Sequence, residues 1–506
     1  MQNRNSPKPI KLAQTKTSTR QARTETAFCW HTLSRNTLLV FLFLGVVTLR
    51  VAIASTMQLP QWSEALTIAY GKYILSNGTA GFGVWTQPLL LPLAIGLLWK
   101  LHVDPVTATN LLTATAVGTS TLLFYLFLRK FHRSTAANIG ALILATAPAT
   151  LAHTNFGLPE AVATSFLILA LYAASNKQKL LLALAIALSL ATTLKTAPFF
   201  LAAALWQGYP LVAMHTTKKE KRDAAKHLLI LITLSTLAIA PPLITTINYA
   251  QNPLQTLFTT TFQTSSGTTC QTDPFSNLAF FTSTLFLQIP LAAFLLIGIA
   301  IAPKKRTSAS TLALTMTAAG AATLLFTCQH IENTALLLPF FIFFHLEGWK
   351  LVALFLERTK KPTDVAWMLL ATLQLCWILL FLNATLYASQ PNTQGVFAKE
   401  WFANLPNGLG ITTTPYPASF TNNKMIPLFL PASTPHAKQQ CANATWLIES
   451  TCDKNALQHN ASRWHAHCEE VVPHWPSEEN GYQNEYQGVR TLNLHECKHT
   501  LYIKAK

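Results

Sequence analysis

The chain has 506 residues, of which half are hydrophobic and only 11% are charged, whereas a soluble domain carries about 25% charged residues. The apolar residues fall in blocks of about 17 to 25, the length that crosses a bilayer, which argues against a soluble fold. The formal net charge of +17 does not indicate nucleic-acid binding, because the basic residues lie in short loops between apolar blocks, where they orient membrane helices.

The chain begins with a basic segment. Residues 1–36 hold seven Lys and Arg residues against the single acid Glu25, and they are rich in Thr, Ser, Asn and Gln. This composition predicts a disordered tail, and its positive charge places the N-terminus in the cytoplasm. The first apolar block, from about Leu38 to Thr56, lacks a convincing small-residue cleavage pattern, so we expect it to remain as the first membrane span.

Residues 57–105 form a large first outer loop. Their first half is too polar to cross a bilayer. The block from Trp85 to Trp99 is apolar but short, with two prolines near its start and an aromatic residue at each end. Such a block is typical of a helix that lies on the membrane surface. We therefore predict an interfacial helix here rather than a span.

The transmembrane domain, residues 37–387, contains ten further apolar blocks, which gives about eleven membrane helices. With this count the clusters of Lys and Arg fall in the inner loops, while the outer loops between spans hold one Lys and no Arg. Counting Trp85–Trp99 as a span would move every later cluster outside, against the positive-inside rule. The ten blocks lie near 107–128, 134–152, 161–176, 180–194, 196–214, 227–247, 277–302, 309–327, 334–352 and 364–387.

Residues 388–506 are polar, rich in Pro and Asn, and contain short alternating apolar runs. They predict a small extracytoplasmic soluble domain of mixed α/β structure. The predicted fold class is thus an all-α polytopic membrane protein with a small mixed α/β C-terminal domain, in the plasma, inner or endoplasmic reticulum membrane.

The cysteines separate by compartment. Cys29 lies inside and Cys376 lies within a span, whereas an even set falls outside, where oxidising conditions favour disulfides. Two bridges among the four C-terminal cysteines have three pairings, and a Cys270–Cys328 bridge is a further prediction. A metal site is the alternative for residues whose spacing matches no familiar zinc pattern, namely Cys452, His465, His467 and Cys468. The outer set is Cys270, Cys328, Cys441, Cys452, Cys468 and Cys497.

Charged residues on outer loops near the membrane are scarce, so each is informative. Glu64 lies in the first outer loop, Glu160 opens a span in the run FGLPEAVA, and Glu332 lies in CQHIENT. Lys195, in TTLKTAPFF, is a cation between two apolar blocks on the same side. A loop Glu is usually a solvated charge or a helix-start residue, and Lys195 could simply snorkel. A site that acts on a lipid headgroup would nevertheless need such groups on one face.

The order of these features resembles the GT-C class of membrane glycosyltransferases, which includes protein O-mannosyltransferases, the lipid A aminoarabinose transferase and lumenal mannosyltransferases. In those families a first outer loop carries an acidic motif, often Asp-Glu, followed by a membrane-surface helix. Glu64 matches the second acid, and Ser63 stands where the first would be. The resemblance covers roughly residues 38–390. Its weaker matches are Glu160, the run Thr193–Lys195, and His330-Ile331-Glu332, which lacks the Lys and Arg of the related motif.

The resemblance implies transfer of a sugar, such as mannose or another hexose, from a polyprenyl- or dolichyl-phosphate donor to an unidentified acceptor, with inversion. Glu64 is then the expected base, and Glu160 and Glu332 shape the donor or acceptor site. The cations available for the phosphate leaving group are Lys195, Lys72, Arg50 and His330.

No metal ligand set is predicted in the transmembrane domain. A divalent metal held by Glu64 and Glu160 is an alternative that the sequence leaves open. Two other classes of function also stay open. A transporter of a lipid-linked precursor would need charges within spans and an internal repeat. A non-catalytic assembly subunit would fit the missing first acid.

Overall fold

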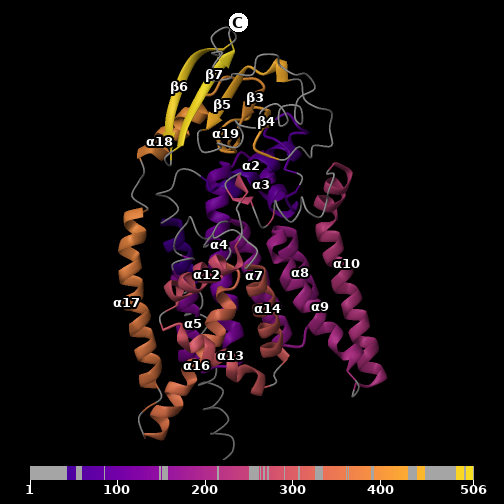
Figure 1. Cartoon of the computed structure of the whole chain (residues 1–506), viewed down its shortest axis with the longest axis vertical. Helices are drawn as coiled ribbons and strands as arrows, with labels where there is room; N and C mark the ends of the chain where they lie inside the picture. Colours follow the sequence, from indigo (N-terminus) through magenta and orange to yellow (C-terminus); the bar gives the residue numbers. More distant parts are fainter. Residues whose placement is uncertain are drawn as a thin grey trace, which may run out of the picture.

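The computed structural model describes residues 43–52, 60–84, 86–147, 150, 158–213, 216–249, 261, 264–265, 268–269, 273–289, 291–305, 308–324, 334–359, 362, 364–388, 393–430, 441–450, 486–494 and 497–504. Its long helices run side by side along the long axis of the molecule, and a β-sheet lies at one end (Figure 1). The sheet and the short helices α2 and α3 lie against each other at that end.

Helices occupy all of the predicted span positions in the described part of the chain. Four of them are long and apolar enough to cross a membrane: Pro105–Leu128, Leu158–Ser175, Lys218–Ile244 and Leu338–Arg358. The chain is therefore a multi-pass membrane protein, while the total of eleven spans stays a prediction. The helices are Phe43–Ala52, α4 (Pro105–Leu128), α5 (Ser134–Thr146), α7 (Leu158–Ser175), α8 (Lys179–Thr192), α9 (Ala197–Val212), α10 (Lys218–Tyr249), α12 (Pro274–Gln288), α13 (Ala293–Lys305), α14 (Ser308–Leu324), α16 (Leu338–Arg358) and α17 (Asp364–Ala388).

One predicted span is divided. The block expected as a continuous span at 277–302 forms two helices, because α12 ends at Gln288 and α13 begins at Ala293. Leu291, between them, has a positive φ of 55°, and the sequence places Pro290 just before it. A proline lacks the N–H that a continuing helix needs, which explains the break.

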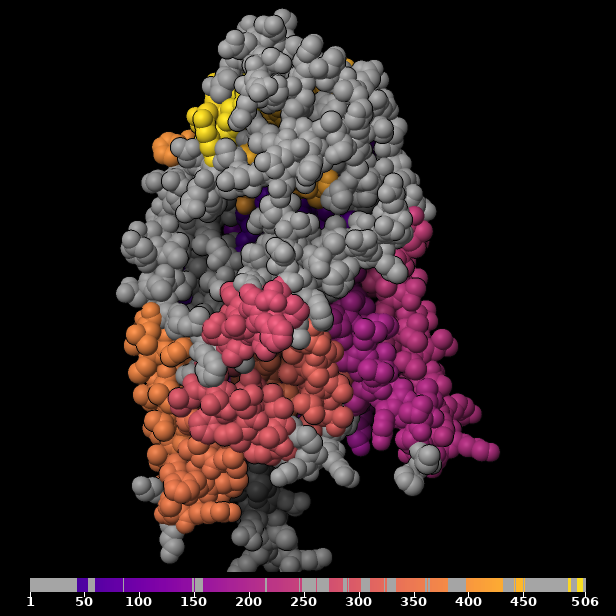
Figure 2. Space-filling view, in the orientation of Figure 1, coloured from indigo at the N-terminus to yellow at the C-terminus, as the bar shows by residue number. Residues whose placement is uncertain are grey.

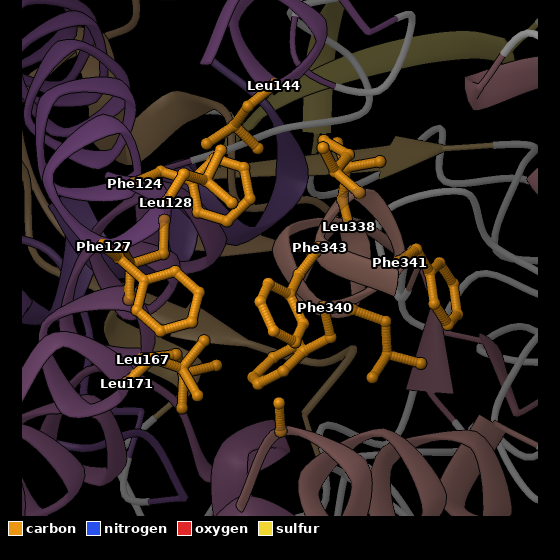
Figure 3. Packing of buried hydrophobic residues seen from close by; sticks show 14 of the residues in the cluster. Phe124, Phe127, Leu128, Leu144, Leu167, Leu171, Leu338, Phe340, Phe341 and Phe343 are labelled. Carbon is orange, nitrogen blue, oxygen red and sulfur yellow. The ribbon is translucent and has the colours of Figure 1, made fainter. Parts of the chain in front are cut away.

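The centre of the helical part is a continuous apolar core. Side chains of α4, α5, α7 and α16 meet there, with a concentration of phenylalanines from α4 and α16 (Figure 3). Phe127 and Phe343 lie 5.3 Å apart between ring centroids. By contrast, α10 and α17, which flank the face in Figure 2, expose many large apolar side chains, as expected of surfaces that meet lipid.

Helices α13 and α16 approach each other more closely than ordinary side chains permit. A Cβ atom on Gly298 would lie 1.7 Å from the carbonyl oxygen of Phe344, and one on Gly348 would lie 1.9 Å from that of Phe294. Small residues at facing positions are a common means of packing membrane helices backbone to backbone. This pair fixes α16 against its neighbour.

The C-terminal region carries a five-stranded mixed sheet in the order β4-β3-β5-β7-β6. Strands β4 (Met425–Pro427), β3 (Gly410–Thr412) and β5 (Trp446–Ser450) are mutually parallel, whereas β7 (Cys497–Lys504) pairs antiparallel with β5 and with β6 (Tyr486–Leu494). Helices α18 (Thr393–Ala403) and α19 (Pro417–Phe420) accompany it. The described residues that hold the sheet and these two helices, 393–430, 441–450, 486–494 and 497–504, are called the outer module below.

The loop predicted to be the first outer one holds α2 (Trp62–Leu75) and α3 (Leu90–Lys100). The latter covers most of the predicted interfacial block, and its 11 residues are fewer than the roughly 20 needed for a span. It buries Leu91 and Ile95 and exposes Leu93 and Leu97. Such an apolar exposed face fits a helix that lies on the membrane surface.

Of the six cysteines predicted to lie outside, Cys441 is the one whose side chain is described. It is buried and disulfide-bonded. The other outer cysteines lie outside the residues with described side chains, so the pairing stays a prediction. The alternative metal site at Cys452, His465, His467 and Cys468 lies wholly outside the described residues.

Candidate active site at the outer end of α7

The first turn of α7 carries a buried carboxylate. Glu160 lies two residues after the start of the helix, where the helix dipole favours a negative charge. Its Oε1 accepts a hydrogen bond of 3.0 Å from Nζ of Lys195, and the side chains of Glu160 and Lys195 are 2% and 25% exposed. Its Oε2 is buried and has no hydrogen-bond partner among the described residues.

Lys195 is positioned by a short local structure. It lies in the 3-10 turn η2 (Leu194–Thr196), which separates α8 from α9. The hydroxyl of Thr193 caps this turn by accepting from the backbone N–H of Lys195 at 3.3 Å. The ammonium group therefore comes to Glu160 from a different helix pair, and the two residues, 35 apart in sequence, meet only through the packing of α7 on α8.

Glu64 joins two helix starts. As the third residue of α2 it accepts at Oε2 from the backbone N–H of Gln61, at 3.0 Å, in the manner of a capping box. Its Oε1 accepts at 3.2 Å from the backbone N–H of Leu158, the first residue of α7. Glu64 is fully buried. Its two oxygens accept hydrogen bonds from backbone amides that the starts of the two helices would otherwise leave unpaired.

Arg50 lies beside this junction. It is buried near the end of helix Phe43–Ala52, and its Nη1 donates to the carbonyl oxygen of Thr150 at 2.9 Å. The charges of Arg50 and Glu64 attract each other. Arg50, Glu64, Glu160 and Lys195, predicted separately from the sequence, are thus linked to the outer end of α7, two cations with two carboxylates.

Lys72 belongs to a different environment. Its Nζ donates to the carbonyl oxygens of Ala418 and Thr421, both at 2.9 Å, and more weakly to that of Ser419 at 3.5 Å. The side chain is buried, and Nζ lies 5.8 Å from the ring centroid of Trp99. Burial lowers the pKa of Lys72 to about 8, although the charge of Asp104 opposes this change. These contacts give Lys72 a role in holding the outer module and do not favour its predicted role in binding phosphate.

Two predicted residues cannot be placed. His330 and Glu332 lie in 325–333, outside the described residues. Among the residues that the structure does describe, no group of three or more His, Cys, Asp or Glu side chains is arranged to hold a metal ion. The divalent metal considered for Glu64 and Glu160 therefore stays an untested alternative.

Sequence reasoning missed the backbone groups that complete this region. The N–H of Leu158 donates to Glu64, and carbonyls within residues 418–421 accept from Lys72. The side chains of these partner residues do not indicate the contacts. A signal was present for the cap of α2, because Gln61 precedes Glu64 by three residues, the spacing of a capping box. No comparable sequence signal marks the contacts of Lys72.

The arrangement at Glu160 can do two kinds of chemistry. A buried carboxylate with one oxygen that has no described partner can accept a proton from a hydroxyl group placed beside it. A partly exposed ammonium group can attract a phosphate. The Glu160–Lys195 pair offers both within 3.0 Å.

The fold of the chain has counterparts among solved structures. ArnT from Cupriavidus metallidurans bound to undecaprenyl phosphate aligns with a TM-score of 0.59 and 10% identity, over 92% of this chain and 97% of that one. The same protein in the apo state aligns with a TM-score of 0.54 and 10% identity, over 78% and 86%. Both are GT-C glycosyltransferases. The chain has the GT-C fold.

The GT-C fold is also that of the archaeal oligosaccharyltransferase AglB from Archaeoglobus fulgidus, solved with an inhibitory peptide and a dolichol-phosphate. It aligns with a TM-score of 0.51 and 12% identity, over 85% of this chain and 71% of that one. No sequence family matches the chain, and no curated protein sequence matches it. The likeness therefore confirms the predicted GT-C resemblance at the level of fold.

Proposed function

We propose that the chain is a glycosyltransferase that moves a sugar from a polyprenyl-phosphate donor to an acceptor on the extracytoplasmic side of the membrane. The observation that carries this proposal is the buried Glu160–Lys195 pair, in which one carboxylate oxygen has no described partner. The fold adds support, because the similar ArnT structure contains undecaprenyl phosphate and the AglB structure contains a dolichol-phosphate.

The proposed reaction is a single displacement. The acceptor oxygen attacks the anomeric carbon, its proton passes to Oε2 of Glu160, and the bond between that carbon and the phosphate oxygen breaks. The leaving polyprenyl phosphate keeps the bonding electron pair, and Lys195 stabilises its negative charge. Attack from the face opposite the leaving group inverts the anomeric carbon.

Glu64, the base expected from the sequence, remains the alternative to Glu160. Its contacts favour a supporting role, because both of its oxygens already accept hydrogen bonds from backbone N–H groups, those of Gln61 and Leu158. Glu160 has one oxygen without a partner among the described residues and lies next to the cation that would face the phosphate. We therefore propose Glu160 as the base and Glu64 as the residue that fixes the start of α7.

The test uses the purified full chain in lipid nanodiscs. Undecaprenyl- and dolichyl-phosphate sugars, with labelled mannose, other hexoses or aminoarabinose, are supplied with host lipid, glycan and peptide fractions as acceptors. Transfer of label and release of polyprenyl phosphate are measured together. Glu160→Gln and Glu64→Gln are compared with Glu400→Gln, an exposed carboxylate on α18.

We expect wild type and Glu400→Gln to release polyprenyl phosphate and transfer label, and Glu160→Gln to lose both. Glu64→Gln should retain part of the activity. Full activity in Glu160→Gln together with complete loss in a folded Glu64→Gln would return the role of base to Glu64. Failure of the wild type both to bind either polyprenyl phosphate and to turn over any donor would contradict the proposed function.

A further inference from the structure

Two charged residues of helix α2 make hydrogen bonds to different parts of the protein. Glu64 stands in its first turn and Lys72 stands eight residues later, about 12 Å along the axis at the usual rise per residue. The first contacts α7 of the transmembrane domain, and the second contacts α19 of the outer module. One rigid helix therefore touches both.

The attachment to the outer module is extensive. Lys72 donates to carbonyl groups at the end of α19, where the helix leaves carbonyls without partners within the helix. Around it, residues of α2 and its following loop share one apolar core with the outer module. That core contains Ala69, Tyr70, Phe82, Val84, Phe402, Met425, Phe429 and Trp446.

Backbone contacts hold α2 and the loop after it to the outer module and to α3. Gly81 donates its N–H to the carbonyl of Asn423 at 2.9 Å and accepts from the N–H of Met425 at 3.0 Å, so the loop after α2 adds to the edge of β4. A Cβ on Gly71 would lie 2.4 Å from the carbonyl oxygen of Pro92, so α2 and α3 pack backbone to backbone. Movement of α19 would therefore carry α2 with it.

The other end of α2 leads to the candidate base. The bond from the N–H of Leu158 to Glu64 fixes the first residue of α7, and Glu160 follows two residues later. Trp62, at the start of α2, also packs on Phe429 of the outer module, with ring centroids 5.2 Å apart. A continuous series of contacts thus runs from α19 through Lys72, α2 and Glu64 to the start of α7.

We propose that Lys72 is a positioning residue that couples the outer module, through α2 and Glu64, to the first turn of α7. The consequence for catalysis rests on the proposed function, because it assumes that Glu160 reacts. The coupling itself does not depend on catalysis. Coupling between two sites is reciprocal, so weakening either end of α2 should loosen the far end.

Hydrogen exchange followed by mass spectrometry tests this coupling in the full chain in nanodiscs without any substrate. Lys72→Met keeps the length of the side chain and removes its charge and donors. Glu64→Gln keeps the shape of the side chain at the other end. Lys399→Met, an exposed lysine on α18, is the matched control.

We expect Lys72→Met to raise exchange at least fivefold in a peptide covering residues 158–162, besides its local effect at 417–421. Glu64→Gln should do the converse and raise exchange at 417–421. Neither should change α14, and Lys399→Met should change no region. If Lys72→Met loosens only 417–421, or if Glu64→Gln loosens only 158–162, the coupling is absent. Should Lys72→Met fail to fold, Glu64→Gln decides the outcome alone.

Activity supplies a separate readout. If the donor is turned over, Lys72→Met should lower kcat about tenfold with less than a threefold change in the donor KM, and Lys72→Arg should recover most of kcat. A rise in donor KM alone would instead mean that Lys72 binds substrate. A wild type without activity would refute the proposed function. The hydrogen-exchange result would still test the coupling, because it needs no substrate.

Discussion

Two buried carboxylate clusters, one at each end of the helical part, are alike in composition and differ in how completely they are paired. At the outer end, Glu160 pairs with Lys195 at 3.0 Å, with side chains 2% and 25% exposed. At the other end, Glu347 of α16 pairs with Lys350 at 2.7 Å, with side chains 4% and 27% exposed. Exposure and charge therefore do not distinguish the two.

The difference lies in the remaining contacts. Glu347 Oε1 also lies 3.4 Å from Nε2 of His132, and Lys350 donates to the carbonyl of Phe131, so this cluster ties the turn between α4 and α5 to α16. The outer pair leaves Oε2 of Glu160 without a described partner. A buried carboxylate oxygen without a partner is costly and calls for an explanation. A reacting hydroxyl group would supply one, which separates a catalytic candidate from a structural pair.

The largest effect is expected at Glu160. In Glu160→Gln the general base is lost, which typically costs about 10²–10⁴-fold in rate, while the amide still accepts from Lys195 and the fold should persist. Initial rates of polyprenyl phosphate release, measured beside thermal unfolding, check this. Equal loss of rate and stability would make the outer pair structural, like the inner one.

The inner cluster should give the opposite pattern. Glu347→Gln leaves Lys350 without its counter-charge, and because that lysine is partly exposed we expect a loss of about 1–3 kcal/mol in stability. Unfolding in detergent by urea measures this, with Glu357→Gln, an exposed carboxylate on the same helix, as the control. The rate per folded molecule should stay within twofold of that of the wild type. A hundredfold loss of rate would mean that Glu347 is not merely structural.

The two lysines provide a third comparison. Lys195→Met should raise the donor KM about tenfold, equivalent to about 1.4 kcal/mol, because a charged contact to phosphate is lost. Lys350→Met should leave that KM unchanged and lower stability instead. Titration of each variant with polyprenyl phosphate measures binding without turnover. Unaltered binding in Lys195→Met would remove Lys195 from the phosphate site.

The smallest effect concerns pH and Lys72. Burial lowers its pKa to about 8 from an ordinary 10.5, so between these values the unfolded chain binds more protons than the folded one. Stability contributed by Lys72 therefore rises with pH in that window, by no more than about 1.4 kcal/mol per pH unit. Unfolding of wild type and Lys72→Met from pH 8 to 9.5 should show this slope in the difference. A flat or falling difference would mean that Lys72 keeps its charge.

Much of the helical part could be predicted from the sequence because lipid demands apolar blocks of a fixed length and the basic loops orient them. The short interfacial block and its helix α3 follow from the same rule. The division of 277–302 into α12 and α13 had a visible cause in Pro290, yet apolarity alone cannot distinguish a broken helix from a continuous one. The break could be identified only from the backbone conformation.

The candidate site was predictable in its members and not in its contacts. Scarcity of charge drew attention to Glu64, Glu160 and Lys195, and the predicted membrane topology puts all three on one side. Neither scarcity nor topology says which oxygen is free, because that depends on neighbouring backbone amides. Glu64, the expected base, has both oxygens occupied, whereas Glu160 has one without a described partner.

The sequence by itself thus determined that the chain is built for a membrane and that it resembles the GT-C class, and it predicted the side on which the scarce carboxylates stand, because these follow from composition and spacing. Only the tertiary structure decided which carboxylate has an oxygen without a described partner and which buried pair makes further contacts. These differences depend on hydrogen bonds between side chains and backbone groups that are distant in sequence. Examples are the bonds of Glu64 to Leu158 and of Lys72 to residues 418–421, which form only when the chain packs.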